Sequence, residues 1–278
     1  MLKRVLVAVV CIPIIFLVFF LPFPILMPVA ISVLSMIALH EVLWSTGFVK
    51  NSKISMLSIA LAGVIPFWVY IGEGMKSALV AIFIYFILIF AVAISSKYTV
   101  TMEKMGGAFF FAMLIPYFLS SFVRIRNLEG KIGTWDIGLF YILLPLVVAF
   151  CSDTFALFAG MLFGKHKLAP ELSPKKTVEG AIGGFVGAIV CSMLYGAVVH
   201  IWFGVEVNYV LLAVYGALGS PIAQMGDLSF SYIKRQYGIK DFGNIFPGHG
   251  GVLDRFDSVI FCAPLLEILI RWLPAIGV

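Results

Sequence analysis

Charged residues are scarce in this sequence of 278 residues. Asp, Glu, Lys and Arg make up 12% of the chain, against about 25% in a typical soluble domain. The hydrophobic fraction is 62%, and the mean hydropathy is +1.09. A soluble domain of this length needs more charge for its surface than the chain contains. The composition therefore excludes a soluble globular protein and indicates a polytopic membrane protein.

Cysteine is also scarce, and several familiar motifs are missing. The four cysteines lie far apart inside apolar runs and form no C-x-x-C pair, which indicates packing residues. No Walker G-x-x-x-x-G-K-[ST] sequence occurs, and no internal repeat suggests an inverted-repeat transporter. The first apolar stretch has no small-residue cleavage site after it, so we expect a retained helix and no signal peptide.

Apolar runs bounded by charge, Gly or Pro predict an all-α membrane protein with about nine transmembrane helices. Lys and Arg are more frequent in the loops on the N-terminal side of the membrane, thirteen against four, which places the N-terminus in the cytoplasm. Arg124 and Arg126 are the exception to this bias. The expected spans are residues 4–20, 22–44, 55–72, 77–95, 106–123, 137–164, 178–203, 208–232 and 254–274.

These spans suggest two regions of the chain. We expect residues 1–135 to form an N-terminal membrane region of about five spans. Residues 136–278 should form a C-terminal catalytic membrane region of about four spans. The longest polar loops, 165–177 and 233–253, both fall on the cytoplasmic side, where nucleotides and Mg²⁺ are abundant.

Three aspartates lie near the cytoplasmic ends of the last two expected spans. An ionisable group inside a membrane costs about 3 kcal/mol or more, so such residues suggest function. Asp254 and Asp257 are three residues apart and share one helix face, and Asp227 lies at a similar depth. Crowded carboxylates repel each other unless a cation neutralises them. Oxygen ligands without a Cys/His cluster favour Mg²⁺ over zinc.

Other ionisable residues within spans indicate a functional site less specifically. Asp153 lies deeper in its span, where a structural contact explains it as well as a place at the same metal centre. For His40, Glu41 and Glu267 we expect buried ion pairs or hydrogen-bonded helix contacts.

The loop before residue 178 is rich in basic residues. Ser173 can cap a helix that starts at Pro174, which places Lys175 and Lys176 in its first turn. Cations there oppose the helix dipole, and a bound phosphate would resolve the conflict. The alternative is a basic flank of the cytoplasmic side without a ligand.

Glycines occur in two settings with different meanings. Gly180, Gly183, Gly184 and Gly187 follow successive turns of one span, which indicates close helix packing. Gly248, Gly250 and Gly251 instead flank His249 in a loop, where backbone N–H groups can approach an anion. A plain hairpin loop is the alternative. Together, the charged loops and the aspartates suggest a triphosphate and its metal held at the membrane surface beside a lipid.

Two motifs stand out in the C-terminal half of the chain. The first is the L-S-P-K-K-T-x-E-G stretch from Leu172 to Gly180. The positions of the second are Ser231, Lys234, Arg235, Lys240, Asp241, Gly243, Phe246, Pro247, His249, Gly250, Gly251, Asp254, Arg255 and Asp257. In both motifs the chain resembles the phosphatidate cytidylyltransferase, or CDP-diacylglycerol synthase, family. The long family signature is met without departure, and the resemblance is strong over roughly 150–260.

The resemblance implies an integral membrane enzyme that converts CTP and phosphatidate to CDP-diacylglycerol and pyrophosphate. It implies Mg²⁺, leaves a second cation open, and suggests a homodimer in the inner cell membrane without a nucleic-acid partner. A CTP-dependent lipid kinase and a transporter are the alternative functions.

From the charges and the resemblance together, we assign expected roles. Metal ligands would be Asp227, Asp254 and Asp153. The catalytic residues would be Asp227, Asp254, Asp257, Lys234 and Arg235. Substrate-binding residues would be Ser173, Lys175, Lys176, Ser231, Lys240, Asp241, His249, Gly250, Gly251 and Arg255.

Overall fold

The protein is predominantly helical in a computed structural model that describes residues 13–21, 23–49, 51–72, 75–96, 100–245 and 250–277. Within these ranges, six helices are long and apolar enough to cross a membrane, and Leu79–Ser95 is a shorter apolar helix. This confirms an all-α membrane protein; the total of nine spans and the orientation stay predictions. The six helices are Leu26–Ser45, Ser52–Ile71, Met102–Arg126, Ile137–Phe163, Val178–Phe203 and Tyr209–Gln236.

The first and the last of the expected spans are not among these six helices. Most of span 4–20 lies outside the described residues, although 13–20 are helical. Helix α11 (Leu253–Trp272) matches span 254–274 in position and length. It is not among the six apolar helices because it carries Asp254, Arg255, Asp257, Glu267 and Arg271.

The described chain divides into two compact units. The first contains residues up to Arg124 together with Tyr237–Arg255, and the second contains Ile125–Gln236 and Phe256–Val278. The loop after α10 therefore belongs with the N-terminal helices, and α11 begins in the first unit and continues in the second.

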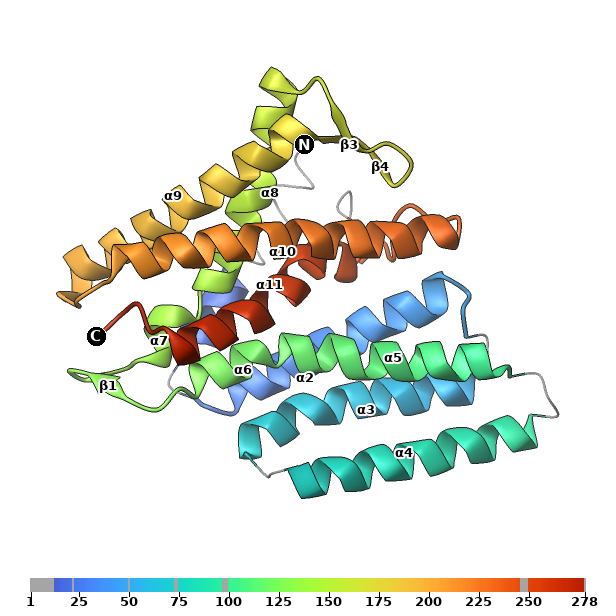
Figure 1. The fold of residues 1–278 in the computed structure, drawn as a ribbon. Helices are drawn as coiled ribbons and strands as arrows, with labels where there is room; N and C mark the ends of the chain where they lie inside the picture. The colour runs from blue at the N-terminus through green and yellow to red at the C-terminus, as the bar shows by residue number, and fades with distance from the viewer. Residues whose placement is uncertain are drawn as a thin grey trace. The chain divides into compact units, whose positions relative to one another are not determined.

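Packed helices form the first unit. Helix α2 packs against α3 and α5, and α3 also packs against α4, as Figure 1 shows. Buried hydroxyl groups join some of these helices: Ser32 Oγ donates to the Gly63 carbonyl at 2.7 Å, and the Ser58 and Tyr85 hydroxyl oxygens lie 2.8 Å apart. The elements are α2 (Leu26–His40), the π-helix η1 (Glu41–Ser45), α3 (Ser52–Ile71), α4 (Met75–Ser95), α5 (Met102–Leu119) and α6 (Ser121–Arg126), whose last two residues fall in the second unit.

The second unit is organised around close packing of α8 against α9. A methyl group at Gly180 would lie 2.7 Å from the Ala156 carbonyl oxygen, and one at Gly184 would lie 2.6 Å from that of Ser152. These contacts confirm the helix-packing interpretation of the glycines. The elements are β1 (Lys131–Ile132), β2 (Trp135–Asp136), α7 (Gly138–Tyr141), α8 (Leu144–Phe163), β3 (Lys167–Ala169), β4 (Ser173–Thr177), α9 (Val178–Phe203), α10 (Tyr209–Gln236) and most of α11.

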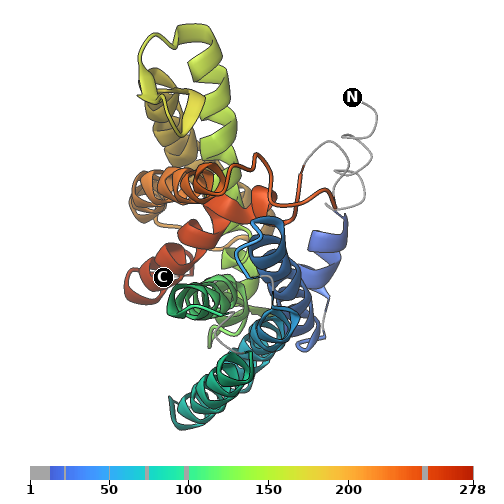
Figure 2. The same cartoon turned by 90° about the vertical axis from the view of Figure 1, so that its right-hand side faces the viewer.

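The basic stretch before α9 is a β-hairpin, so the helix start expected at Ser173 and Pro174 is wrong. Strands β3 and β4 pair antiparallel, with Lys167 opposite Thr177, at one end of the α8–α9 pair (Figures 1 and 2). Helix α9 begins four residues later than expected because Thr177 is its cap, with Oγ1 accepting from Gly180 N at 3.1 Å. A Thr cap followed by Glu179 suits the helix dipole better than two lysines in the first turn.

The polar loop expected from residue 233 begins later than its charge pattern suggested. Helix α10 continues to Gln236, so Lys234 and Arg235 lie in its last turn. Cations at a helix C-terminus interact favourably with the dipole, which explains how the helix extends through them.

Candidate active site

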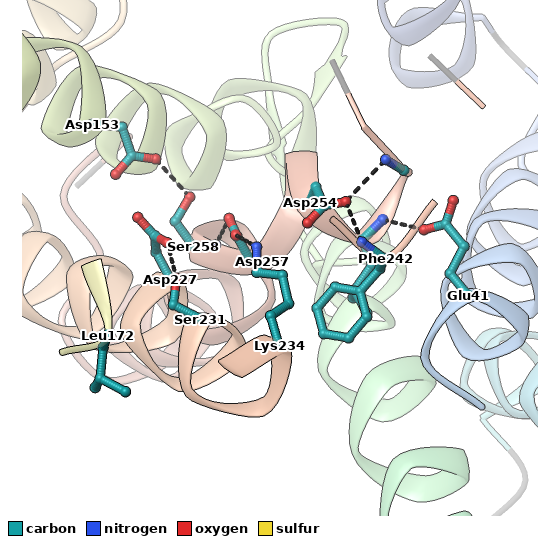
Figure 3. Close-up of polar contacts among 12 residues, drawn as sticks. Glu41, Asp153, Leu172, Asp227, Ser231, Lys234, Phe242, Asp254, Asp257 and Ser258 are labelled. Atoms are coloured by element: carbon teal, nitrogen blue, oxygen red, sulfur yellow. Dashed lines mark hydrogen bonds and ion pairs between the residues drawn. The ribbon is translucent and has the colours of Figure 1, made fainter. Parts of the chain in front are cut away.

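Three aspartates from three helices approach one another in the second unit. Asp153 comes from α8, Asp227 from α10 and Asp257 from α11. Ser258 links two of them: its hydroxyl donates to Asp153 Oδ2 at 2.9 Å, and its backbone N–H donates to Asp257 Oδ1 at 2.8 Å (Figure 3). The charges of Asp227 and Asp153 both act on Asp257. The structure thus brings together three of the predicted acidic residues as one cluster.

Two lysines offset part of this negative charge. Lys176 Nζ, from β4, lies 2.5 Å from Asp227 Oδ2, and Lys234 Nζ lies 4.0 Å from Asp257 Oδ2. The Lys176 and Asp227 side chains are 26% and 25% exposed, whereas Lys234 and Asp257 are nearly buried. Ser231 Oγ donates to Asp227 Oδ1 at 3.3 Å. The Lys176–Asp227 pair is therefore partly accessible to a ligand from water.

Hydrogen bonds hold the β3–β4 hairpin to the helices beside it. Arg235 Nε donates to the Leu172 carbonyl at 3.2 Å, which ties the hairpin to the last turn of α10. At the base of the hairpin, Glu179 accepts from Lys165 N and His166 N at 3.1 and 3.2 Å. These contacts fix the strand from which Lys176 extends. Neighbouring Lys175 is exposed, and Ser173 is half-buried.

In the first unit, Asp254 hydrogen-bonds to two backbone amides of the signature segment, which we define as the part of the family signature within Tyr237–Arg255. Its Oδ2 accepts hydrogen bonds from Phe242 N at 2.8 Å and Gly251 N at 3.0 Å, as drawn in Figure 3. Asp254 is buried at the start of α11, so these bonds join Phe242 and Gly251 to the first helical turn. The structure gives Asp254 these contacts, and its role as a metal ligand stays a prediction.

Glu41 takes part in the same region, which the sequence did not predict. Its carboxylate, drawn in Figure 3, accepts one hydrogen bond from Val252 N at 2.9 Å and another from Leu253 N at 2.8 Å. The expectation of a hydrogen-bonded structural contact for Glu41 is confirmed. Its partners are loop and helix-start amides of the signature segment, 211 and 212 positions away in the chain. Nothing in the local sequence around Glu41 indicates them.

The remaining predicted substrate residues have simpler surroundings. Lys240, Asp241 and Arg255 are exposed. Gly250 has a φ of +83°, a left-handed conformation that favours glycine. The expected anion contact of His249 lies outside the described residues.

The donor chemistry of the acidic cluster fits a hard divalent cation, since Mg²⁺ prefers carboxylate oxygens. In the described part of the chain, no group of three or more His, Cys, Asp or Glu side chains is arranged to hold a metal ion. The Lys176 ammonium group lies against Asp227 Oδ2, so a metal could bind through this oxygen only if the pair opened, whereas Oδ1 accepts a hydrogen bond from Ser231. The residues present suit Mg²⁺ by the chemistry of their oxygen atoms, and a bound metal stays a prediction.

Comparisons with known proteins agree with this combination of membrane helices and charged residues. A sequence model of the cytidylyltransferase family matches residues 2–273. A phosphatidate cytidylyltransferase of Bacillus subtilis (strain 168) is 35% identical over 260 residues, which are 90% of this chain and 89% of the relative. One of Thermotoga maritima is 36% identical over 175 residues, 62% of each chain. One of Staphylococcus saprophyticus is 47% identical over 133 residues, 48% of this chain and 50% of the relative.

The apolar helices and these similarities define a membrane-bound nucleotidyltransferase. The chain belongs to the cytidylyltransferase family. The resemblance seen in the sequence is thereby confirmed.

Proposed function

We propose that the protein transfers the cytidylyl group of CTP to phosphatidate, forming CDP-diacylglycerol and pyrophosphate for phospholipid synthesis. The observation that carries this proposal is the cluster in which Lys176 and Lys234 lie against Asp227 and Asp257 within a membrane-helix unit. Relatives named phosphatidate cytidylyltransferase support the choice of substrates.

The reaction is a direct in-line displacement. A phosphate oxygen of phosphatidate attacks the α-phosphorus of CTP, and a new P–O bond forms. The bond from that phosphorus to the bridging oxygen breaks, and its electron pair leaves with pyrophosphate. A phosphate monoester dianion is already nucleophilic at neutral pH, so the step needs no general base. The protein's part is to position two mutually repelling anions and to offset the charge that develops.

The basic residues hold the phosphates of CTP or of the lipid. Lys176 and Lys234 already lie in the acidic cluster, and Arg235 lies in the same last turn of α10. Lys175 and His249 complete the set that we propose for phosphate contact, and Ser173, Ser231, Lys240, Asp241, Gly250, Gly251 and Arg255 line the substrates. A departing pyrophosphate gains most from such charges, since its negative charge rises in the transition state.

Mg²⁺ is the proposed cofactor, with Asp227, Asp254 and Asp153 as its ligands and Asp257 as a ligand or an orienting neighbour. When bound, Mg²⁺ supplies charge neutralisation for the reacting phosphates. A second cation remains compatible with so many carboxylates. We propose further that the enzyme is a homodimer in the inner cell membrane, with its active site on the cytoplasmic side, where CTP is available.

The test is the identity of both products. Purified protein with CTP, Mg²⁺ and phosphatidate in micelles should release pyrophosphate and form CDP-diacylglycerol, separated by chromatography. Release of CDP with a phosphorylated lipid would contradict the proposal and identify a lipid kinase.

The direct route has its own test. Labelled pyrophosphate should not exchange into CTP when the enzyme is free of lipid substrate and lipid product. Rapid exchange under these conditions, abolished by His249→Ala, would show a covalent cytidylyl-enzyme instead.

A further inference from the structure

Three successive backbone N–H groups in the signature segment donate to two carboxylates. Gly251 N donates to Asp254, whereas Val252 N and Leu253 N donate to Glu41. Leu253 is the first residue of α11, so Glu41 satisfies N–H groups that a helix start leaves without an intrahelical partner. The carboxylate of Glu41, the first residue of η1, thus caps the N-terminus of α11.

Burial and a neighbouring negative charge both disfavour an ionised carboxylate at Glu41. Glu41 is only 2% exposed, and the second charge is that of Asp254. Two neighbouring buried carboxylates repel each other, and they are stable together only if donors surround them. Four backbone N–H groups and the positive end of the α11 dipole supply this stabilisation.

Two glycines of the family signature, Gly243 and Gly251, leave room for the Glu41 carboxylate. A methyl group at Gly251 would lie 2.5 Å from both carboxylate oxygens of Glu41, and one at Gly243 would lie 2.5 Å from Oε1. Neither position has a φ in the left-handed region, so the backbone conformation alone does not require glycine there. The loop therefore packs directly on the Glu41 carboxylate on two sides.

The backbone around Glu41 has an unusual form that suits this contact. Helix α2 widens into the π-helix η1, and Glu41 is its first residue. Short π-helical turns are rare in proteins. Those that do occur are often found at functional sites, because they shift the side chains that follow. The Phe48 ring, shortly after η1, also packs edge to face against the Tyr237 ring, directly after α10, with centroids 5.6 Å apart. This is a second contact between the chain around η1 and the segment Tyr237–Arg255.

We propose that Glu41 is a positioning residue for the active site: its carboxylate holds Gly243, residues 251–253 and the first turn of α11 so that Asp254 is correctly oriented. This inference rests on the proposed function of the signature segment. Glu41 does not touch substrate. It acts through the amides of Val252 and Leu253 and through its contact with Gly251.

The first test measures the loop itself in the full-length protein. Glu41→Gln keeps the size of the side chain but presents an NH₂ group to one of the two donors. Peptide hydrogen exchange over residues 250–255 should become about tenfold faster in this variant. Glu267→Gln is the matched control, since Glu267 is also buried but pairs with Arg271 at 2.9 Å. Unchanged protection in Glu41→Gln would overturn the proposal whatever the enzyme's activity.

The second test measures turnover. Glu41→Gln should lower kcat by about 10²-fold, with a smaller change in KM for CTP, because a misplaced catalytic group slows the chemical step. Glu41→Asp should recover part of the loss, and Glu267→Gln should resemble the wild type. A kcat for Glu41→Gln within twofold of the wild type would contradict the proposal. A wild-type protein that forms no CDP-diacylglycerol would instead contradict the proposed function, and the exchange experiment would still decide the role of Glu41.

A double variant tests the shared contact. Gly251→Ala should reduce the hydrogen-exchange protection of residues 250–255 in the wild type, because the new methyl group meets the carboxylate oxygens. In a Glu41→Ala background this clash is gone, so the added loss should be small. Full multiplication of the two losses would show that the glycine is not packed on Glu41 and would overturn that part of the argument.

Discussion

Lys176 Nζ lies 2.5 Å from Asp227 Oδ2, which joins a hairpin strand to a membrane helix. Both side chains are about one-quarter exposed, so the pair can open toward a ligand. A phosphate can replace the carboxylate beside Lys176, and a cation can replace the ammonium group beside Asp227. The pair is therefore where we expect substrate and Mg²⁺ to enter the charged cluster.

The first prediction compares two neighbouring lysines. Lys176→Met should lower kcat/KM for CTP by about 10- to 100-fold, because it removes a charge held at the cluster. Lys175→Met removes the proposed phosphate contact of an exposed side chain on the same strand; because charge interactions are weaker in water, it should cost only about threefold. Steady-state kinetics with varied CTP measures both. Equal, near-normal values for the two variants would place the phosphate site elsewhere.

The second prediction concerns metal dependence. Removing divalent cations with a chelator should stop turnover, and added Mg²⁺ should restore it. Asp227→Asn should lower kcat by about 10²- to 10³-fold and raise the Mg²⁺ concentration needed for half-maximal activity. Asp136→Asn is the control, since Asp136 pairs with Arg126 at 3.4 Å and is 46% exposed. Near-normal turnover of Asp227→Asn at saturating Mg²⁺ would remove Asp227 from the metal site.

The sequence predicted the helices well because long apolar runs report a membrane environment directly. It also singled out Asp227 and Asp257, since carboxylates are costly within spans. It failed at Ser173–Thr177, where Ser and Pro imitate a helix start. This segment is a strand because it pairs with β3, with Lys167 opposite Thr177, and no local sequence pattern predicts that pairing. Glu41 was identified as a structural contact, but its partners lie more than two hundred residues away.

The third prediction tests the packing that supports the cluster. Gly184→Ala should destabilise the protein by about 1–3 kcal/mol, because the new methyl group meets the Ser152 carbonyl oxygen at 2.6 Å. Gly106→Ala is the control: it also lies in a helix, and an added Cβ has nothing within 4 Å. Thermal unfolding in detergent compares the two. Equal melting temperatures for the two variants would show that α8 and α9 do not pack this closely.

The fourth prediction concerns orientation in the membrane. Glu171 is exposed in the turn between β3 and β4, so a cysteine placed there is accessible to a reagent. In a background without the native cysteines, a membrane-impermeant thiol reagent should label it in inside-out vesicles and not in intact cells. Labelling from outside intact cells would reverse the proposed topology and place the hairpin away from cytoplasmic CTP.

The central claim is that the α-phosphorus of CTP, and not its γ-phosphoryl group, is transferred to the lipid. The most direct measurement compares two labels in parallel, with purified protein, Mg²⁺ and phosphatidate. With CTP labelled at the α-phosphorus, the radioactivity should appear in the lipid fraction. With CTP labelled at the γ-phosphorus, it should appear only in pyrophosphate. Label from the γ-position in the lipid, or no CTP-dependent label in the lipid from either position, would contradict the account.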